Sequence, residues 1–459
     1  MHGRPAPQET EQSRASHPRA SRGKGHIGRI VVGSITAGLV GAITLVAGPF
    51  AGAREHVITG SVLLTFALAW AALAFLSERR TDQPQRWAKA PAAFMAVAGA
   101  TILAVAPTGN ALGWVWPPAL VALVIWMIAR SRRALHSRTR AWVVYPVFAT
   151  LLLSAIGGGY ETYRETVDPS ASPMPGRLIS VGDHKLHINC TGTGSPTVVL
   201  EPGLGEPSPA MGWIAPKVTT TTRVCVYDRA GRGWSEASAE PRDGVETATD
   251  LHTLLARAGE QGPYVLAGHS AGGLYVLNYA HLYPDQVAGL VLLDSMHPDE
   301  ATRIKSYSQF YEMFRRVSAA LPSLSRLGVG RAIYATGYDG LPARSRDDER
   351  AFLSTPRDSR SLRDEFSVIK TAMHQAGALH TLGHRPLVVL TARKGAEPGW
   401  TALQNQLAAL STNRVHRVLA NAEHSMLTED ERTAAHSSHA IRRVVLAVRT
   451  GTTLNRKVH

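Results

Sequence analysis

A single serine lies between glycines in "YVLAGHSAGGLYVLNYAH", residues 264–281. A strand-like apolar run ends at Gly268, Ser270 follows, and a helix-like run begins after Ala271. A strand that turns sharply into a helix strains the residue at the turn and leaves its side chain exposed, provided that small residues such as Gly268 and Gly272 relieve the crowding. We therefore predict that Ser270 is a nucleophile. The same residues also allow a simpler interpretation, a serine that caps the helix.

A serine hydroxyl becomes a good nucleophile only when a base removes its proton. The candidate base is His424 in "VLANAEHSMLTED", which follows an apolar strand and precedes the last helix-like segment. His380 and His384 lie beside another helix-like segment, and His416 falls within the predicted strand. We expect surface or core roles for these three histidines. His269, next to the serine, is expected to point away from the chemistry and to pack.

A framework that could position these side chains extends over residues 177–450. Two strands and a turn come first, and β-rich apolar runs then end near Glu201 and Tyr227; three more such runs follow. Helix-like stretches, among them Thr247–Ala258 and Gly272–Leu282, fall between the runs. Buried strands that alternate with helices are typical of a parallel sheet covered on both faces. The sequence therefore predicts an α/β fold.

Four motifs in this region resemble those of the α/β-hydrolase fold family: "GHSAG", "EPGLG" after an early strand, "YDRAGRGWS" after the next, and "NAEHSM" near the end. A lone Gly-x-Ser-x-Gly is weak evidence because Gly and Ser are common residues. Four motifs in the family's order are much more specific. The resemblance covers Arg177 to Val448 and implies an α/β-hydrolase sheet with a helical cap inserted at residues 299–384. A Pro/Ser-rich linker is predicted before it, at residues 161–176.

The resemblance also implies an acid that orients the histidine. The family usually places this acid after the strand that ends "VVLTARKG", where only Glu397 is available. Some relatives place it one strand earlier, where "LVLLDSMHP" puts Asp294 at the end of an apolar strand. An acid with no Lys or Arg beside it suits a buried partner of an imidazole. We take Asp294 as the acid, in the family's order Ser270, Asp294, His424, and keep Glu397 as the alternative.

Two backbone amides are expected to form the oxyanion hole of such an enzyme. By the resemblance, one belongs to Ala271, directly after the serine, and the other to Leu204 in "EPGLG". This loop departs from the family because it lacks the usual histidine, which leaves the exact residue open. The third motif, with Asp228 and Arg229, is expected to be a structural loop.

The chain contains only two cysteines, Cys190 and Cys225. The sheet order of the family places their strands side by side, so the resemblance implies a disulfide; two buried free thiols are the alternative. A disulfide persists in an oxidising compartment. The sequence has no Cys-x-x-Cys, His-Glu-x-x-His or Walker-type motif. We therefore expect no metal and no organic cofactor.

Residues 30–160 contain five apolar segments, each close to the roughly 20 residues that a membrane-spanning helix needs and none with a Lys, Arg, Asp or Glu. The five predicted spans are Ile30–Phe50, Val57–Leu76, Ala90–Pro107, Ala111–Ala129 and Ala141–Gly159. Ionisable residues inside spans usually mark substrate or proton paths. Their absence favours an anchor over a transporter.

The net charge of +14 is concentrated in a basic tail, residues 1–29, and in two loops between the spans, Ser77–Lys89 and Arg130–Arg140. Basic loops stay on the cytoplasmic side of a membrane. This pattern predicts a disordered cytoplasmic tail and places everything after Gly159 outside. It also explains the charge without nucleic acid as a partner.

Together these features predict a membrane-anchored serine hydrolase of the carboxylesterase or lipase type, which acts on a small-molecule or lipid-like ester. Acyl transfer uses the same residues and remains an alternative reaction. Other classes are a ligand-binding sensor that retains the three catalytic residues, and a transporter with an appended esterase.

Overall fold

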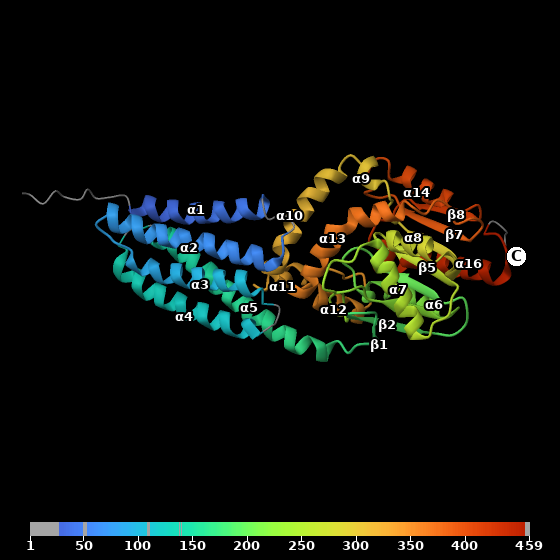
Figure 1. The fold of residues 1–459 in the computed structure, drawn as a ribbon, viewed down its shortest axis with the longest axis horizontal. Helices are drawn as coiled ribbons and strands as arrows, with labels where there is room; N and C mark the ends of the chain where they lie inside the picture. Colours follow the sequence, from blue (N-terminus) through green and yellow to red (C-terminus); the bar gives the residue numbers. More distant parts are fainter. Residues whose placement is uncertain (1–26, 49–52, 108–110, 137, 139, 455–459) are drawn as a thin grey trace, which may run out of the picture.

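The computed structural model describes residues 27–48, 53–107, 111–136, 138 and 140–454. A bundle of long helices lies at the amino-terminal end, an α/β domain lies at the other end, and a group of shorter helices lies between them (Figure 1). The predicted basic tail lies outside the described residues except for its last three, which begin the first helix.

Within the described residues, the bundle has five helices that are long and apolar enough to cross a membrane. Each overlaps one of the five spans predicted from the sequence. Their bounds are α1 Ile27–Ala47, α2 Glu55–Arg80, α3 Lys89–Val105, α4 Ala111–Ala134 and α5 Tyr145–Ala171.

Helix α5 corrects the prediction of a linker at residues 161–176. The helix continues to Ala171, so most of the predicted linker is helical. The extension is stabilised by side chains that the Pro/Ser composition conceals: Arg164 pairs with Asp168 one turn later, and Arg331 of the cap pairs with the same Asp168, each at 2.7 Å. Ion pairs at this spacing support a helix.

The described part of the α/β domain contains a mixed sheet of eight strands in the order β1-β2-β4-β3-β5-β6-β7-β8. The pairs β1–β2 and β2–β4 are antiparallel, and all other neighbours are parallel. The strands are β1 Arg177–Ser180, β2 Lys185–Thr191, β3 Val198–Glu201, β4 Val224–Tyr227, β5 Tyr264–His269, β6 Val287–Leu293, β7 Leu387–Ala392 and β8 Arg414–Leu419.

Helices cover both faces of this sheet, as the alternating pattern predicts. One apolar core lies under α7, α8 and α14, and a second lies under α6 and α16. The covering helices are α6 Ile214–Thr219, α7 Gly244–Ala258, α8 Gly272–Leu282, α14 Trp400–Ala409 and α16 Glu431–Thr450, with the short α15 Met426–Glu429 before the last. The carboxyl ends of the parallel strands, where such folds place their sites, are thereby held rigidly.

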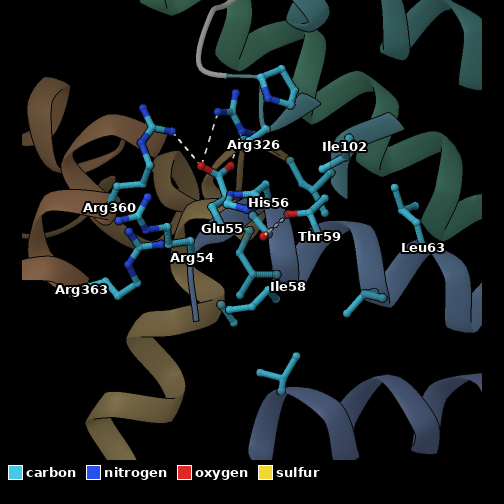
Figure 2. Close-up of a pocket in the computed structure, with 18 of the residues that line it drawn as sticks. Arg54, Glu55, His56, Ile58, Thr59, Leu63, Ile102, Arg326, Arg360 and Arg363 are labelled. Atoms are coloured by element: carbon cyan, nitrogen blue, oxygen red, sulfur yellow. Dashed lines mark hydrogen bonds and ion pairs between the residues drawn. The ribbon is translucent and has the colours of Figure 1, made fainter. Parts of the chain in front are cut away.

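The insert between β6 and β7 forms a helical cap. Its helices are α9 Glu300–Arg303, α10 Tyr307–Ser325, α11 Val329–Tyr334, α12 Ala343–Leu353 and α13 Pro356–Ala376. The cap lies against the bundle (Figure 1). Glu55, at the start of α2, accepts hydrogen bonds from Arg326 and from Arg360, the latter at 2.8 Å, and Thr59 bonds to Ser323 at 2.7 Å (Figure 2).

The two cysteines lie opposite each other on β2 and β4 and form a disulfide with an S–S distance of 2.03 Å. Cys225 is fully buried in the core. The bond joins residues that are 35 positions apart in the sequence. It therefore closes a loop that contains β3, the strand leading into "EPGLG".

Removing this disulfide should destabilise the α/β domain measurably. In the loop-entropy model, a loop of this length contributes about 3–4 kcal/mol to the free energy of unfolding. The double variant Cys190→Ala, Cys225→Ala should lose this amount in denaturant unfolding of the detergent-solubilised protein. Each single variant should lose a similar amount, because either one breaks the bond. A double variant as stable as the wild type would contradict the prediction.

Candidate active site

Ser270 lies at the sharp turn between β5 and α8. Its φ of +54° is in the left-handed region, which a non-glycine residue rarely adopts. The Ser270 amide donates to Leu293 O at 3.1 Å, and its carbonyl accepts from Met296 N at 2.9 Å. A Cβ atom added to Gly272 would lie 2.4 Å from Glu201 O, and one added to Gly268 would lie 2.5 Å from the carbonyl oxygen of Gly272. The turn thus requires the small residues that the motif supplies.

His424 and Asp294 are directly paired. His424 Nδ1 lies 2.7 Å from Asp294 Oδ2. The second carboxylate oxygen, Oδ1, accepts hydrogen bonds from Ala392 N at 3.0 Å and from Trp400 Nε1 at 2.7 Å. Because an ionised carboxylate only accepts, His424 Nδ1 must carry the hydrogen. The neutral ring therefore keeps a lone pair on Nε2, which is the form that a general base needs.

His269, for which the sequence indicates packing, is buried and bridges two parts of the site. Its Nδ1 lies 3.3 Å from Glu206 Oε2, and its Nε2 lies 3.3 Å from the carbonyl oxygen of His424. The rings of His269 and His424 are 4.7 Å apart between centroids. Burial opposes a charge on His269, but the Glu206 carboxylate outweighs it and raises the pKa of His269 above its ordinary value. His269 thus positions the backbone of His424.

The other histidines considered as the base, and the alternative acid, make no hydrogen bond to the His424–Asp294 pair in the described structure. His416 bonds to Thr391 Oγ1 at 2.7 Å and to Asn405 Oδ1 at 2.8 Å on the edge of the sheet. His380 and His384 are exposed. The alternative acid, Glu397, is exposed in the loop before α14. The structure brings Asp294, and not Glu397, to His424.

Leu204, the predicted oxyanion residue, lies in the loop after β3. The backbone amides on either side of it, those of Gly203 and Gly205, both donate hydrogen bonds within the protein. Gly203 N donates to Glu206 Oε2 at 2.7 Å, and Gly205 N donates to Glu365 Oε2 at 3.1 Å. Among the residues that the structure describes, the amides of Leu204 and Ala271 have no hydrogen-bond partner. Since unpaired backbone amides are uncommon away from water, these two N–H groups are available to a ligand.

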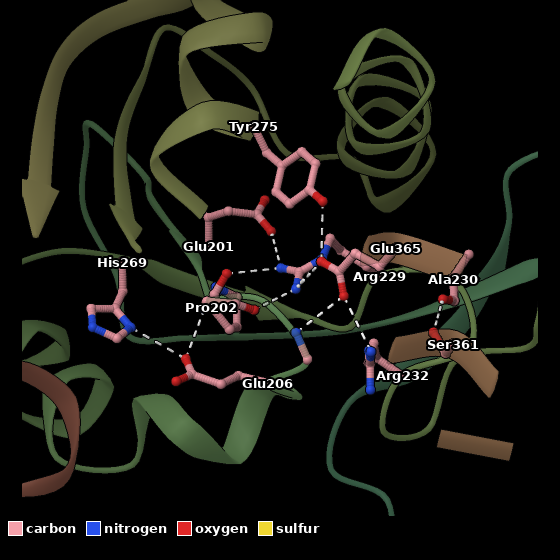
Figure 3. A network of polar contacts seen from close by, with 12 residues as sticks. Glu201, Pro202, Glu206, Arg229, Ala230, Arg232, His269, Tyr275, Ser361 and Glu365 are labelled. Atoms are coloured by element: carbon pink, nitrogen blue, oxygen red, sulfur yellow. Dashed lines mark hydrogen bonds and ion pairs between the residues drawn. The ribbon is translucent and has the colours of Figure 1, made fainter. Parts of the chain in front are cut away.

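Arg229, in the loop after β4, holds the loop after β3 in place through its hydrogen bonds (Figure 3). Arg229 Nη1 donates to Glu201 Oε1 at 2.6 Å and to Pro202 O at 2.8 Å, and its Nη2 donates to Gly203 O at 2.5 Å. The same Nη2 lies 2.7 Å from Glu365 Oε1. Arg229 therefore fixes both the end of β3 and the loop that follows it.

The two carboxylates beside Arg229 differ in their electrostatics. Burial raises the pKa of Glu201 to about 7, even though Arg229 opposes the rise. Burial acts on Glu365 in the same direction, but Arg229 and Arg232 together outweigh it and hold the pKa of Glu365 below its usual range. The pKa values of the two carboxylates shift in opposite directions because two arginines act on Glu365, whereas Arg229 alone acts on Glu201. Glu365 is thus the charged partner in the network.

Asp228 has the structural role that the sequence suggests for its loop. Its carboxylate accepts from Ser208 N at 2.5 Å and from Trp234 N at 3.1 Å, and it pairs with His187 Nδ1 at 2.8 Å. These partners come from three separate segments. Asp228 therefore ties the loops around the site together.

Comparison with known proteins identifies the family. Residues 196–390 match the model of a family described as alpha/beta hydrolase fold. The domain has the α/β-hydrolase fold. A solved structure of aCif, a single-residue variant, superposes with a TM-score of 0.52 at 16% identity and covers 62% of this chain and 96% of that chain. At this identity the likeness shows the fold alone.

Two curated relatives of this chain are uncharacterized proteins. One, from Schizosaccharomyces pombe, is 28% identical over 300 residues, which are 57% of this chain and 54% of that protein. The other, YbdG of Bacillus subtilis, is 29% identical over 167 residues, which are 36% of this chain and 51% of that protein. The chain thus spans about half the length of these curated relatives.

Three residues that support the α/β-hydrolase site escape sequence reasoning: Glu206, Trp400 and Glu365. Glu206 lies in the same loop as Leu204, and this proximity is the one local signal that could have drawn attention to it. Trp400 bonds to Asp294 from 106 positions away in the sequence. Glu365 bonds to Gly205 from 160 positions away.

Removing Arg229 should destabilise the hydrolase domain strongly. The variant Arg229→Met removes the cation that pairs with buried Glu201 and one of the two cations that pair with Glu365. Loss of one partner of a buried ion pair typically costs about 3–5 kcal/mol. Thermal or denaturant unfolding would measure the effect. The control is Arg414→Met, at an exposed position of the edge strand β8, which should stay within about 0.5 kcal/mol of the wild type. Equal stability of the two variants would contradict the prediction.

Proposed function

We propose that this chain is a membrane-anchored serine hydrolase that cleaves an ester or a related acyl bond. The observation that carries the proposal is the hydrogen-bonded pair of His424 and Asp294, together with Ser270, a serine held at positive φ whose amide bonds to Leu293, the residue before Asp294. A serine, a histidine and a buried acid in these positions are the components of nucleophilic acyl chemistry.

In the proposed first step, Ser270 Oγ attacks the acyl carbonyl carbon while His424 Nε2 takes the hydroxyl proton. Asp294 holds the ring and stabilises its protonated form. The amides of Leu204 and Ala271 donate to the oxygen that becomes negative. The bond to the leaving group then breaks, the leaving group takes the proton from His424, and the acyl group stays on the serine.

In the second step, water attacks the acyl-serine and His424 takes one of its protons. The bond between the acyl carbon and Ser270 Oγ breaks, and the proton returns to the serine. The products are a carboxylic acid and a free enzyme. An alcohol in place of water would give acyl transfer by the same residues, so product analysis separates hydrolysis from transfer.

We also propose that the hydrolase domain lies outside the cytoplasm. Basic loops between the helices support this orientation, because positive residues stay on the cytoplasmic side. The disulfide between Cys190 and Cys225 supports it independently, because such bonds persist in oxidising compartments.

A membrane-impermeant fluorophosphonate probe tests both parts of the proposal. Intact cells that express the wild type should be labelled, and cells that express Ser270→Ala should not. Labelling that appears only after lysis would keep the activated serine and overturn the orientation. No labelling of the wild type in either condition would overturn the hydrolase proposal and favour a ligand-binding sensor.

A further inference from the structure

A large cavity lies between the bundle, the cap and the hydrolase domain. Its volume is about 1710 Å³, and residues of all five bundle helices, of α10 and of α13 line it. Sites for drug-sized ligands are typically about 300–1,000 Å³. The cavity therefore has room for a much larger molecule.

The part of the cavity within the bundle is apolar. Side chains from several helices face it, for example Leu39, Ile43, Leu63, Phe66, Ile102 and Leu151. Such a lining suits hydrocarbon chains, because burial of apolar surface is the main favourable term for them.

The other end of the cavity is lined by arginines. Among the described residues, eight arginines and four carboxylates line the cavity. Some of these arginines also pair with carboxylates outside the lining, as Arg229 does with Glu201 and Arg242 does with Asp250. Figure 2 shows part of this end, where Arg326 and Arg360 converge on Glu55. The single Glu55 carboxylate is shared by two guanidinium groups, so this group of three side chains has a net positive charge.

Arg363 has an unsatisfied donor at this end. Its side chain lines the cavity and is 7% exposed. Nε and Nη2 donate to Asp364 Oδ1 at 2.8 and 2.6 Å, whereas buried Nη1 has no hydrogen-bond partner within the described part of the chain. A buried charged donor without a partner is costly. Phosphate oxygens are well matched to a guanidinium fork.

We infer that this cavity binds a phospholipid with a net negative head group. Its acyl chains lie among the bundle helices, and its phosphate accepts hydrogen bonds at the arginine-lined end, from Arg363 Nη1 in particular. The arginine-lined end lies where α2 begins at Glu55, at the boundary of a membrane-capable helix, which is where phosphates of a bilayer lie. Among the described residues that line the cavity, neither Ser270 nor His424 is present. The lining does include Arg229 and Glu365, so the cavity reaches the network that holds the loop after β3 but not the proposed catalytic residues themselves.

Native mass spectrometry of the full-length protein in detergent tests this inference independently of catalysis. Phosphatidylglycerol and phosphatidylcholine with identical acyl chains serve as the probes. We expect preferential retention of phosphatidylglycerol by the wild type, and about a tenfold lower affinity for it in Arg363→Met, the loss typical of one charge-assisted hydrogen bond. The control Arg414→Met removes the same charge at the distant edge strand β8 and should bind like the wild type.

A second variant tests the apolar part of the cavity. Ala98, on α3, lines it, and Ala98→Phe should reduce binding of both lipids without lowering the melting temperature. Equal retention of the two lipids by the wild type, or unchanged phosphatidylglycerol affinity in a folded Arg363→Met, would overturn the inference. Displacement of bound lipid by oleate but not by phosphatidylglycerol would also overturn it, in favour of a fatty carboxylate.

Discussion

The variant Ser270→Ala should lower kcat/KM for a simple p-nitrophenyl ester by about 10⁶-fold, as removal of the nucleophile does in serine hydrolases. The reason is that no other group occupies the strained turn between β5 and α8, so the covalent path is lost while the fold is retained. Steady-state kinetics of the detergent-solubilised enzyme would measure the loss, and an unchanged melting temperature would show that the variant is folded.

The matched control for this variant is Ser367→Ala, at an exposed position of α13. It removes the same hydroxyl from a residue outside the proposed catalytic group and should keep the wild-type rate. A Ser270→Ala enzyme that keeps even a tenth of the wild-type rate would contradict the proposed nucleophile.

The second large effect is expected from Asp294→Asn, with a loss of about 10⁴-fold in kcat. Asparagine can still accept from Ala392 N and Trp400 Nε1 through its oxygen, so the local structure should survive. Its amide group would then face His424 Nδ1 as a donor. The ring would place its hydrogen on Nε2, and it could no longer accept the proton of Ser270.

Glu397→Gln is the control for Asp294→Asn, because Glu397 is the other acid that the sequence offers. We expect its kcat to stay within about twofold of the wild type, since an exposed carboxylate is well solvated and contributes little. The reverse result, a large loss in Glu397→Gln and a small one in Asp294→Asn, would assign the acid to the loop before α14.

Local sequence was sufficient for the parts of the site that depend on neighbouring residues. The turn at Ser270 depends on glycines two positions away, and the strand before Asp294 is recognisable from its apolar run. The acid itself was a choice between two residues, because the strand ends that meet His424 become neighbours only in the folded sheet. The spacing of apolar residues in a sequence indicates whether a segment is a helix or a strand, but not which other segments it contacts in the fold.

The polar network behind the site could not be predicted for the same reason. Glu365 comes from a cap helix and bonds to Gly205, 160 positions earlier in the sequence. No periodicity or spacing links the two. The extension of α5 was missed because Pro169 and the surrounding serines suggested a linker, whereas the ion pairs that stabilise the helix involve Arg331 of the cap.

In the proposed membrane-anchored enzyme, the uninterrupted α5 would set the distance between the bilayer and Ser270. Its 27 residues correspond to about 40 Å of helix, more than the roughly 30 Å of a hydrocarbon core. Gly157 packs so closely on the cap that an added Cβ would lie 2.2 Å from Leu327 O, so the domain has little freedom to tilt. With the bundle in a bilayer, Ser270 would act at a fixed height. Esters would then be selected partly by how far their acyl bond lies from the membrane plane, and not only by their chemical groups.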